Sequence, residues 1–153
     1  MLDKDAYYMN MALREAREAF DEGEIPVGAV IVAADKVLAK THNLTETLTD
    51  VTAHAEILAI TAASSALGGK YLPQCTLYVT VEPCPMCAGA LGWAQIGRIV
   101  YGAPDSKRGF LSRYADGLDV ARTALHPRTV VEGGVLEEEC ASLMRDFFKA
   151  RRR

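Results

Sequence analysis

The feature that most constrains this chain is a pair of short motifs that must meet in space to work together. The first is His54-Ala55-Glu56, and the second is Pro83-Cys84-Pro85-Met86-Cys87. One histidine and two cysteines supply three ligands of the kind that Zn²⁺ prefers, and three protein ligands leave a coordination position open, as a catalytic zinc requires. The fold must therefore bring two segments thirty residues apart to one point.

The spacing of the first motif indicates that it begins a helix. Side chains two positions apart point away from each other in the middle of a helix. His54 and Glu56 can therefore converge only from a first turn. We expect a helix from about residue 53 to 67, with Thr52 as its N-cap.

The second motif also has the features of a helix start. Pro85 suits the first helical position, where its missing N–H costs no hydrogen bond. Cys84 and Cys87 then lie on one face near the positive end of the helix dipole, which favours the metal-binding thiolate form. We expect this helix to run from 85 to about 95.

Two readings other than a catalytic metal site remain open. A Cys-x-x-Cys pair can act in redox chemistry, although that use needs no His-x-Glu motif. A structural zinc would need a fourth protein ligand. Four residues are candidates for that ligand: His42, Cys75, His126 and Cys140. Of these, Cys75 and Cys140 also suit small core positions.

Length and composition are those of one soluble domain spanning residues 1–153. Apolar residues make up 50% of the 153-residue chain and charged residues 24%, with no apolar run long enough for a membrane span. The charged N-terminus does not read as a targeting segment, so we expect a cytoplasmic protein. Residues 1–97 hold 6 Lys and Arg against 12 Asp and Glu, whereas residues 98–153 hold 11 against 8. The basic end could contact a polyanion or simply be a solvated helix terminus.

Periodicity and turn signals predict alternating strands and helices. The expected helices are 3–22, 53–67, 85–95 and 135–151, and the expected strands are 27–34, 37–43, 76–81, 98–102 and 129–132. This order calls for a mixed sheet covered by helices on both faces. Ligands of such sheets bind beyond the carboxyl ends of the strands, where the helices carrying His54 and Cys84 begin.

The combination His-x-Glu with Pro-Cys-x-x-Cys is the signature of zinc-dependent nucleobase deaminases. Beyond it, the chain resembles bacterial tRNA-specific adenosine deaminases (the TadA type) in blocks along nearly its whole length. These blocks are 24–30, Asn43, 52–56, 82–90, 101–103, 105–107 and 146–153. The resemblance implies a three-layer α/β/α cytidine-deaminase-like fold with a mixed five-stranded central sheet. It also implies a homodimer with one Zn²⁺ per subunit that converts adenosine to inosine at the wobble position of a tRNA anticodon stem-loop.

Carried over residue by residue, the resemblance makes His54, Cys84 and Cys87 the metal ligands. Zn²⁺ lowers the pKa of a water molecule towards neutrality, and Glu56 would shuttle its proton. Attack on an amidine-like ring carbon and loss of ammonia complete a hydrolysis of the cyclic amidine C–N bond. The expected activity is therefore that of a tRNA adenosine(34) deaminase.

The resemblance also implies a set of substrate-binding residues. They are Pro26, Val27, Asn43, Ala55, Asp105, Lys107, Phe148 and Arg152. Asn43 would hydrogen-bond the flipped base, but it could equally be a turn residue that ends a strand. Pro26 and Val27 could be mere architecture, and the loop with Asp105 and Lys107 a capped, solvated turn.

The C-terminal helix gives an independent indication of RNA contact. Its apolar stripe consists of Leu136, Cys140, Leu143 and Phe147. Phe148 falls about 100° from that stripe. An aromatic side chain beside Arg145, Lys149 and Arg152 suits stacking on an unpaired base near phosphates. A dimer contact could equally cover Phe148.

Three alternatives to the tRNA enzyme follow from the same residues. Pro85 and Trp93 also resemble bacterial guanine deaminases, which convert the free base guanine to xanthine with the same fold and metal site. Short cytidine deaminases generally have Cys where His54 stands. A zinc-stabilised RNA-binding module without catalysis would have no need for Glu56.

Overall fold

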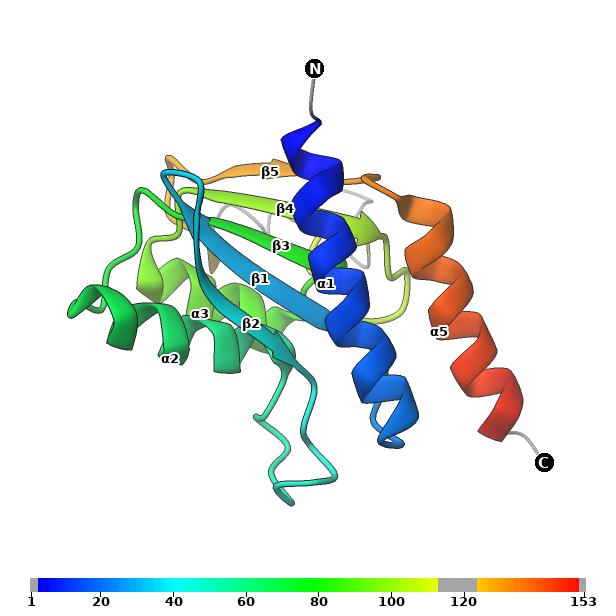
Figure 1. The fold of residues 1–153 in the computed structure, drawn as a ribbon. Helices are drawn as coiled ribbons and strands as arrows, with labels where there is room; N and C mark the ends of the chain where they lie inside the picture. Colours follow the sequence, from blue (N-terminus) through cyan, green and yellow to red (C-terminus); the bar gives the residue numbers. More distant parts are fainter. Residues whose placement is uncertain (1–2, 113–123, 152–153) are drawn as a thin grey trace.

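The computed structural model describes residues 3–112 and 124–151 and shows a five-stranded mixed sheet (Figure 1). The strands lie in the order β2-β1-β3-β4-β5. Their bounds are β1 Gly28–Ala33, β2 Lys36–His42, β3 Thr76–Val81, β4 Arg98–Ala103 and β5 Val130–Glu132. β1 is antiparallel to β2 and to β3, whereas β3, β4 and β5 are parallel. The expected mixed sheet of five strands is confirmed.

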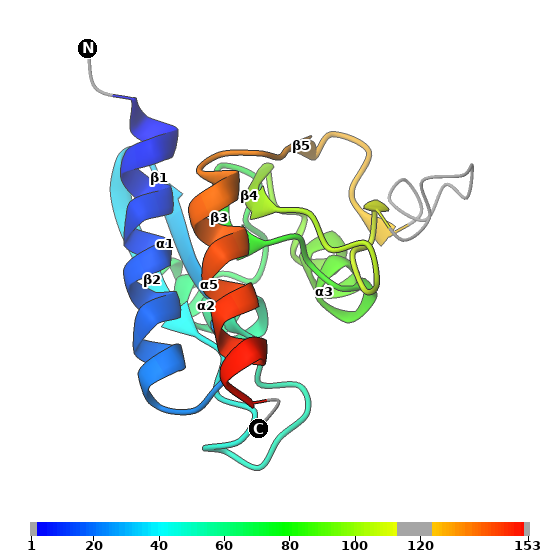
Figure 2. The same ribbon diagram turned by 90° about the vertical axis from the view of Figure 1, so that its right-hand side faces the viewer.

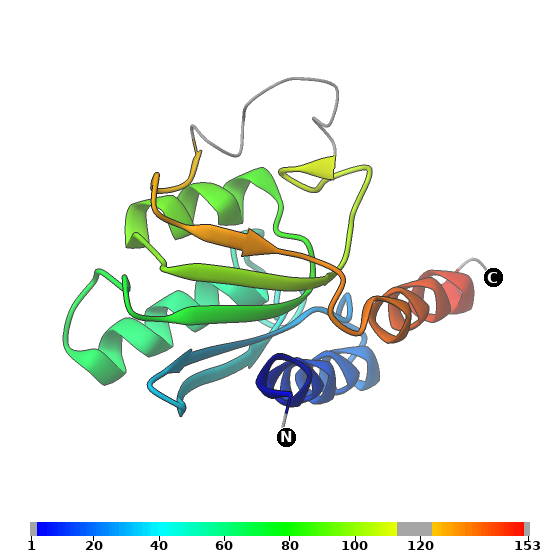
Figure 3. The ribbon, with the colours of Figure 1, turned by 90° about the horizontal axis from the view of Figure 1, so that it is seen from above.

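Helices cover both faces of this sheet and complete three layers. They are α1 Lys4–Asp21, α2 Ala55–Leu67, α3 Pro85–Ala94 and α5 Glu137–Arg151. Seen from above, α1 and α5 lie on one face, and α2 and α3 on the other (Figure 3). Figure 2 shows the same pairing, with α1 beside α5. The three-layer α/β/α fold is therefore confirmed.

Alternating strand residues divide the core between the two faces. Val30, Tyr78 and Val100 belong to the apolar cluster under α1 and α5. Their sequence neighbours Ile31 and Leu77 belong to the cluster under α2 and α3. This period of two arises because successive strand side chains point to opposite faces. Strands covered on both faces are consequently apolar at nearly every position.

Helix α1 shows how local signals fix one layer. Asp3 caps the helix by accepting a hydrogen bond from the backbone N–H of Ala6 at 3.2 Å. Its buried positions, including Met9 and Leu13, recur at helical spacing and face the sheet. Gly28 of β1 lies so close to this helix that a Cβ would approach the Ala12 carbonyl oxygen to 1.9 Å. Only glycine therefore permits this approach of α1 to β1.

Strand direction brings the two motif-bearing helices to one edge of the sheet. β2 and β3 are both antiparallel to β1, so they run in the same direction, and β4 runs parallel to β3. Their carboxyl ends consequently lie at one edge. Helix α2 follows β2, and helix α3 follows β3. Both helix N-termini therefore start from the edge at which we expected ligands to bind.

One expected helix start was wrong. Helix α2 begins at Ala55 with His54 as its N-cap residue, so Thr52 is not the cap. The Thr52 hydroxyl and N–H instead donate to the Asp50 carboxylate at 2.7 and 2.8 Å. This local turn competes with a capping role for Thr52. None of the helices among the described residues has both the length and the apolar character of a membrane-spanning segment.

Candidate metal centre and active site

The two sequence motifs meet at one point of the structure. The Nδ1 atom of His54 lies 3.7 Å from Cys84 Sγ and 3.6 Å from Cys87 Sγ. All three of these atoms lie within 4.8 Å of one another. His54 and Cys84 are the N-cap residues of α2 and α3, and neither uses its side chain to cap its helix. Both side chains are therefore free to turn towards a common centre.

This triangle of one nitrogen and two sulfur atoms fits a zinc ion. Zinc bonds of about 2.0–2.3 Å to nitrogen and sulfur could be made from a point between the three atoms. Within residues 3–112 and 124–151, no fourth His, Cys, Asp or Glu joins the group. Cys75 and Cys140 are buried in the two apolar clusters, as expected, and His42 is bonded to Glu15 of α1 and to Glu22, which follows that helix. Three protein ligands leave a position for water or substrate.

The pKa values of the three side chains follow from their proximity. The hydrogen bond from Cys87, helped by His54, lowers the pKa of the Cys84 thiol to about 4. That same bond and burial raise the pKa of Cys87, so Cys87 keeps the shared proton. The bond to Cys84 raises the pKa of His54. A metal ion would replace the protons on His54 and Cys87, so its binding releases protons.

Glu56 lies in the first turn of α2, next to these three residues. Its side chain is buried, with 4% of the residue exposed. Burial raises the pKa of Glu56 to about 7, and the negative charge of Cys84 adds to that effect. A carboxyl group with a pKa near neutrality can both accept and release a proton, as general acid–base catalysis requires.

The segment expected to bind the base is buried, and its polar groups are used internally. Asn43 donates from Nδ2 to the Ile25 carbonyl at 3.4 Å and accepts from the Thr45 N–H at 3.2 Å. Its side chain thus acts as a turn residue in this structure, while a contact with the base stays a prediction. Pro26 is buried and Val27 is half-buried.

Ala55, Asp105 and Lys107 have defined places in the structure. Ala55 is fully buried as the first residue of α2. The Asp105 carboxylate accepts from the N–H groups of Lys107 and Arg108 at 3.0 and 3.1 Å and so closes its own turn. Lys107 is exposed. The RNA contacts expected of Asp105 and Lys107 stay predictions.

The C-terminal helix α5 has the two faces that its sequence predicts. Phe147 is 5% exposed and packs edge-to-face on Phe20 of α1, whereas Phe148 is 42% exposed. Arg145 and Lys149 are also exposed. Arg152 lies outside the described residues. An exposed aromatic ring between cations is thus confirmed as a surface feature, and its contact with RNA stays a prediction.

Two buried carboxylates near the site were missed from the sequence. Glu24 is fully buried, and Glu82 is 3% exposed. Glu82 directly precedes Pro83-Cys84 and accepts from the N–H groups of Asp105 and Leu111 at 3.0 and 2.7 Å. Each carboxylate is satisfied by the backbone of a distant loop. The only feature of the sequence that indicated their burial was the position of each acidic residue next to an apolar run.

Comparison with known proteins is consistent with this geometry. Residues 2–103 match the family model described as the cytidine and deoxycytidylate deaminase zinc-binding region. The fold, the paired motifs and this match define a zinc-dependent deaminase of the cytidine deaminase class. Zinc, the cofactor expected from the sequence, is thereby confirmed.

Relatives identify the branch of this class. The chain is 42% identical over 152 residues to a tRNA-specific adenosine deaminase of Bacillus subtilis, covering 99% of this chain and 93% of that protein. A solved structure from work on A-to-I editing by tRNA:A34 deaminases at the wobble position superimposes with a TM-score of 0.80 at 42% identity, over 90% of this chain and 98% of that one. The structure of a guanine deaminase of Bacillus subtilis superimposes with a TM-score of 0.63 at 35% sequence identity, over 80% of this chain and 74% of that one. The chain belongs to the tRNA-specific adenosine deaminase family.

Proposed function

We propose that this protein deaminates adenosine to inosine at the wobble position of a tRNA anticodon. The observation that carries the proposal is the convergence of His54, Cys84 and Cys87 beside buried Glu56. Similarity over nearly the full length to tRNA-specific adenosine deaminases selects adenosine in tRNA as the substrate. The structure of the guanine deaminase is less identical in sequence, at 35% against 42% for the tRNA deaminase structure.

In this proposal His54, Cys84 and Cys87 hold one zinc ion per subunit. When bound, zinc supplies a positive charge that makes water a nucleophile near neutral pH. The Glu56 carboxylate takes a proton from the attacking water and passes it to N1 of the adenine ring. Glu56 then transfers the second proton of that water to the amino group at C6. Cleavage of the C6–N bond releases ammonia and leaves inosine, so water and adenosine account for every atom of the products.

Burial supports this role for Glu56. A carboxyl group whose pKa is about 7 loses little free energy in either direction of proton transfer. The deamination needs two transfers in opposite senses, from water to the carboxylate and from the carboxyl group to the substrate. A fully solvated glutamate, with a pKa near 4.3, would give up its proton too readily to hold it between the two steps.

The proposed RNA contact includes two loops and one helix at this edge of the molecule. Asn43, Pro26, Val27 and Ala55 would contact the flipped adenine, and Asp105 and Lys107 the flanking nucleotides. Phe148 would stack on an unpaired base, since its ring is partly exposed between exposed cations. Arg152 would add a phosphate contact from the basic end of the chain.

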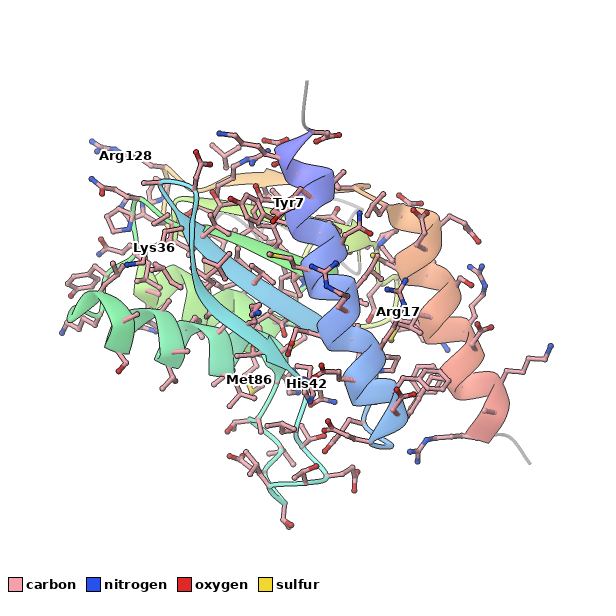
Figure 4. All side chains as sticks on the ribbon, viewed as in Figure 1. Tyr7, Arg17, Lys36, His42, Met86 and Arg128 are labelled. Atoms are coloured by element: carbon pink, nitrogen blue, oxygen red, sulfur yellow. The ribbon has the colours of Figure 1, made fainter. Side chains whose placement is uncertain are left out.

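We also propose that the protein acts as a homodimer in the cytoplasm, with residues 1–153 forming one catalytic domain. Helix α3 supports the dimer, because its ten residues include no charged side chain. Trp93 on this helix is 86% exposed and Met86 is 39% exposed. Figure 4 shows Met86 where α3 begins. An uncharged helix with an exposed tryptophan is typical of a surface that another protein covers.

The test of the proposed activity is a comparison of two substrates. The purified, zinc-loaded protein is incubated with an anticodon stem-loop carrying adenosine at the wobble position, and separately with free guanine. We expect inosine from the stem-loop and no xanthine from guanine. A stem-loop with that adenosine moved by one position is the control and should stay unchanged. Xanthine without inosine would identify a guanine deaminase instead.

A further inference from the structure

Glu24 is a fully buried carboxylate in the segment between α1 and β1. It accepts three hydrogen bonds from one distant loop. Its Oε1 atom accepts from the Glu46 N–H at 2.9 Å, and its Oε2 atom accepts from the Thr47 N–H at 2.6 Å and the Thr47 hydroxyl at 2.7 Å. Burial alone would raise the pKa of Glu24, but these bonds outweigh burial and lower it. The carboxylate is therefore charged and fully engaged.

Hydrogen bonds within the loop set its local shape, and the bonds to Glu24 attach the loop to the segment between α1 and β1. Residues 46–52 are all exposed, and the apolar side chains of Leu48 and Val51 are 52% and 83% exposed. A loop without buried side chains gains no packing energy, so its position depends on hydrogen bonds. Burying a charge costs free energy that these bonds must recover. All the hydrogen bonds described for the buried Glu24 carboxylate therefore serve to hold an exposed loop.

This loop leads directly into the metal centre. It starts after Asn43 and ends at His54, and the Leu44 N–H closes its base on the Ala53 carbonyl at 3.0 Å. A shift of the loop would consequently be felt at both of its ends, the predicted base contact and the predicted metal ligand.

The segment that carries Glu24 also connects the loop to the C-terminal end of helix α5. The Gly23 carbonyl accepts from the Arg151 guanidinium of α5, which also covers the Phe147 ring at 4.4 Å. The Ile25 carbonyl accepts from Asn43 Nδ2. Neighbouring residues 23, 24 and 25 thus hold the end of α5, the loop 44–52 and Asn43.

We infer that Glu24 is a positioning residue for the RNA substrate, which it serves by fixing loop 44–52 relative to Asn43 and the end of α5. This inference rests on the proposed function. Glu24 does not touch the reacting atoms. It lowers the free energy that RNA binding must spend on ordering the loop, so its removal weakens binding more than it slows the chemical step.

The experiment compares Glu24→Gln with a matched control, Glu46→Gln. Both changes remove one negative charge. The exposed Glu46 side chain takes no part in the bonds to Glu24, because these use the Glu46 backbone N–H. Glutamine at 24 presents an NH₂ group to the N–H of Thr47 or Glu46. We expect Glu24→Gln to raise the KM for the stem-loop about tenfold, the equivalent of one charge-assisted hydrogen bond, with kcat within about twofold. In Glu46→Gln, KM should stay the same as in the wild type or decrease.

Zinc content, Tm and hydrogen exchange complete the test. We expect zinc content and Tm to hold, with faster amide exchange confined to Glu46 and Thr47. Equal KM values for the two variants, or a folded, zinc-containing Glu24→Gln protein in which kcat falls while KM holds, would overturn the inference. Inactivity of the wild type on the stem-loop would reject the proposed function but not the attachment of the loop. Unchanged amide exchange at Glu46 and Thr47 in Glu24→Gln would separately reject the attachment of the loop by Glu24.

A second variant covers the case in which Glu24→Gln does not fold. Thr47→Val keeps the carboxylate and removes only the hydroxyl bond from an exposed residue. We expect KM to increase about threefold. The effect is smaller because only the hydroxyl bond is lost, whereas the two bonds from backbone N–H groups to the Glu24 carboxylate remain. A wild-type KM in this variant would contradict the positioning role.

Discussion

At the scale of single residues, the chemistry depends on Glu56 being buried beside the group formed by His54, Cys84 and Cys87. Glu56→Gln keeps the shape of the side chain and removes its ability to carry a proton. We expect the variant to retain zinc and to lose at least about a thousandfold in kcat on the stem-loop, in line with the contribution of general acid–base catalysis. Metal analysis and chromatographic detection of inosine measure both quantities.

The same substitution also makes a prediction about stability. Burial raises the pKa of Glu56 above its ordinary value, so the folded state disfavours the charged form. Neutral glutamine avoids that cost at pH values above the shifted pKa. The Tm of the metal-free variant should therefore equal or exceed that of the metal-free wild type. A zinc-replete, fully active Glu56→Gln protein would refute the assignment of the proton carrier.

At the scale of elements, α1 is attached to the end of β2 through His42 (Figure 4). The two ring nitrogens of His42 lie 3.0 Å from carboxylate oxygens of Glu15 and Glu22, and Glu18 lies 3.9 Å away. Desolvation lowers the pKa of His42, but the bonds to Glu15 and Glu22 outweigh it and raise the pKa above 6.5. The imidazolium form, with two N–H donors, fits both carboxylates.

This attachment predicts a pH-dependent stability. A pKa raised in the folded state adds stability that is complete below 6.5 and is lost as pH rises through the folded-state pKa. The free energy of unfolding of the wild type should thus exceed that of His42→Gln by about 1 kcal/mol near pH 6. Urea unfolding should show the difference shrinking as pH rises through the folded-state pKa, which lies above 6.5. His126→Gln is the matched control, and a His42→Gln difference that did not vary with pH would contradict the prediction.

Elements and ligands were predictable because their signals are local. The positions of glycine and proline and the periodicity of apolar residues predicted the helices and strands to within about two residues of their observed bounds. The pairing of His54 with Cys84 and Cys87 followed from ligand chemistry. Glu24 and Glu82 were not predictable, because their partners are backbone N–H groups 22 or more residues away. The N-cap at Thr52 was wrong because the Thr52 N–H and hydroxyl both donate to the Asp50 carboxylate in a local turn, and α2 begins only at Ala55.

At the scale of the whole molecule, the two faces of the sheet differ in what their helices expose. Helix α1 carries acidic and basic side chains along its outer surface. Helix α3 carries none, and its outer surface shows Met86 and Trp93. Gly89 between them has no atom within 4 Å of the position that a Cβ would take. An uncharged surface around an exposed tryptophan is suited to the same surface of a second copy.

This asymmetry predicts that a charge at Trp93 dissociates the proposed dimer without unfolding the subunit. Trp93 is 86% exposed, so Trp93→Glu removes almost no packing within the subunit, but it would bury an unpaired charge between two copies. We expect light scattering to give twice the 16.6 kDa chain mass for wild type and a single chain mass for Trp93→Glu, with an unchanged circular dichroism spectrum. Tyr7→Glu places the same charge on an aromatic residue of α1 that is 45% exposed, on the opposite face of the sheet (Figure 4), and should remain a dimer. A monomeric wild type, or a dimer that survives Trp93→Glu, would show that α3 does not form the interface.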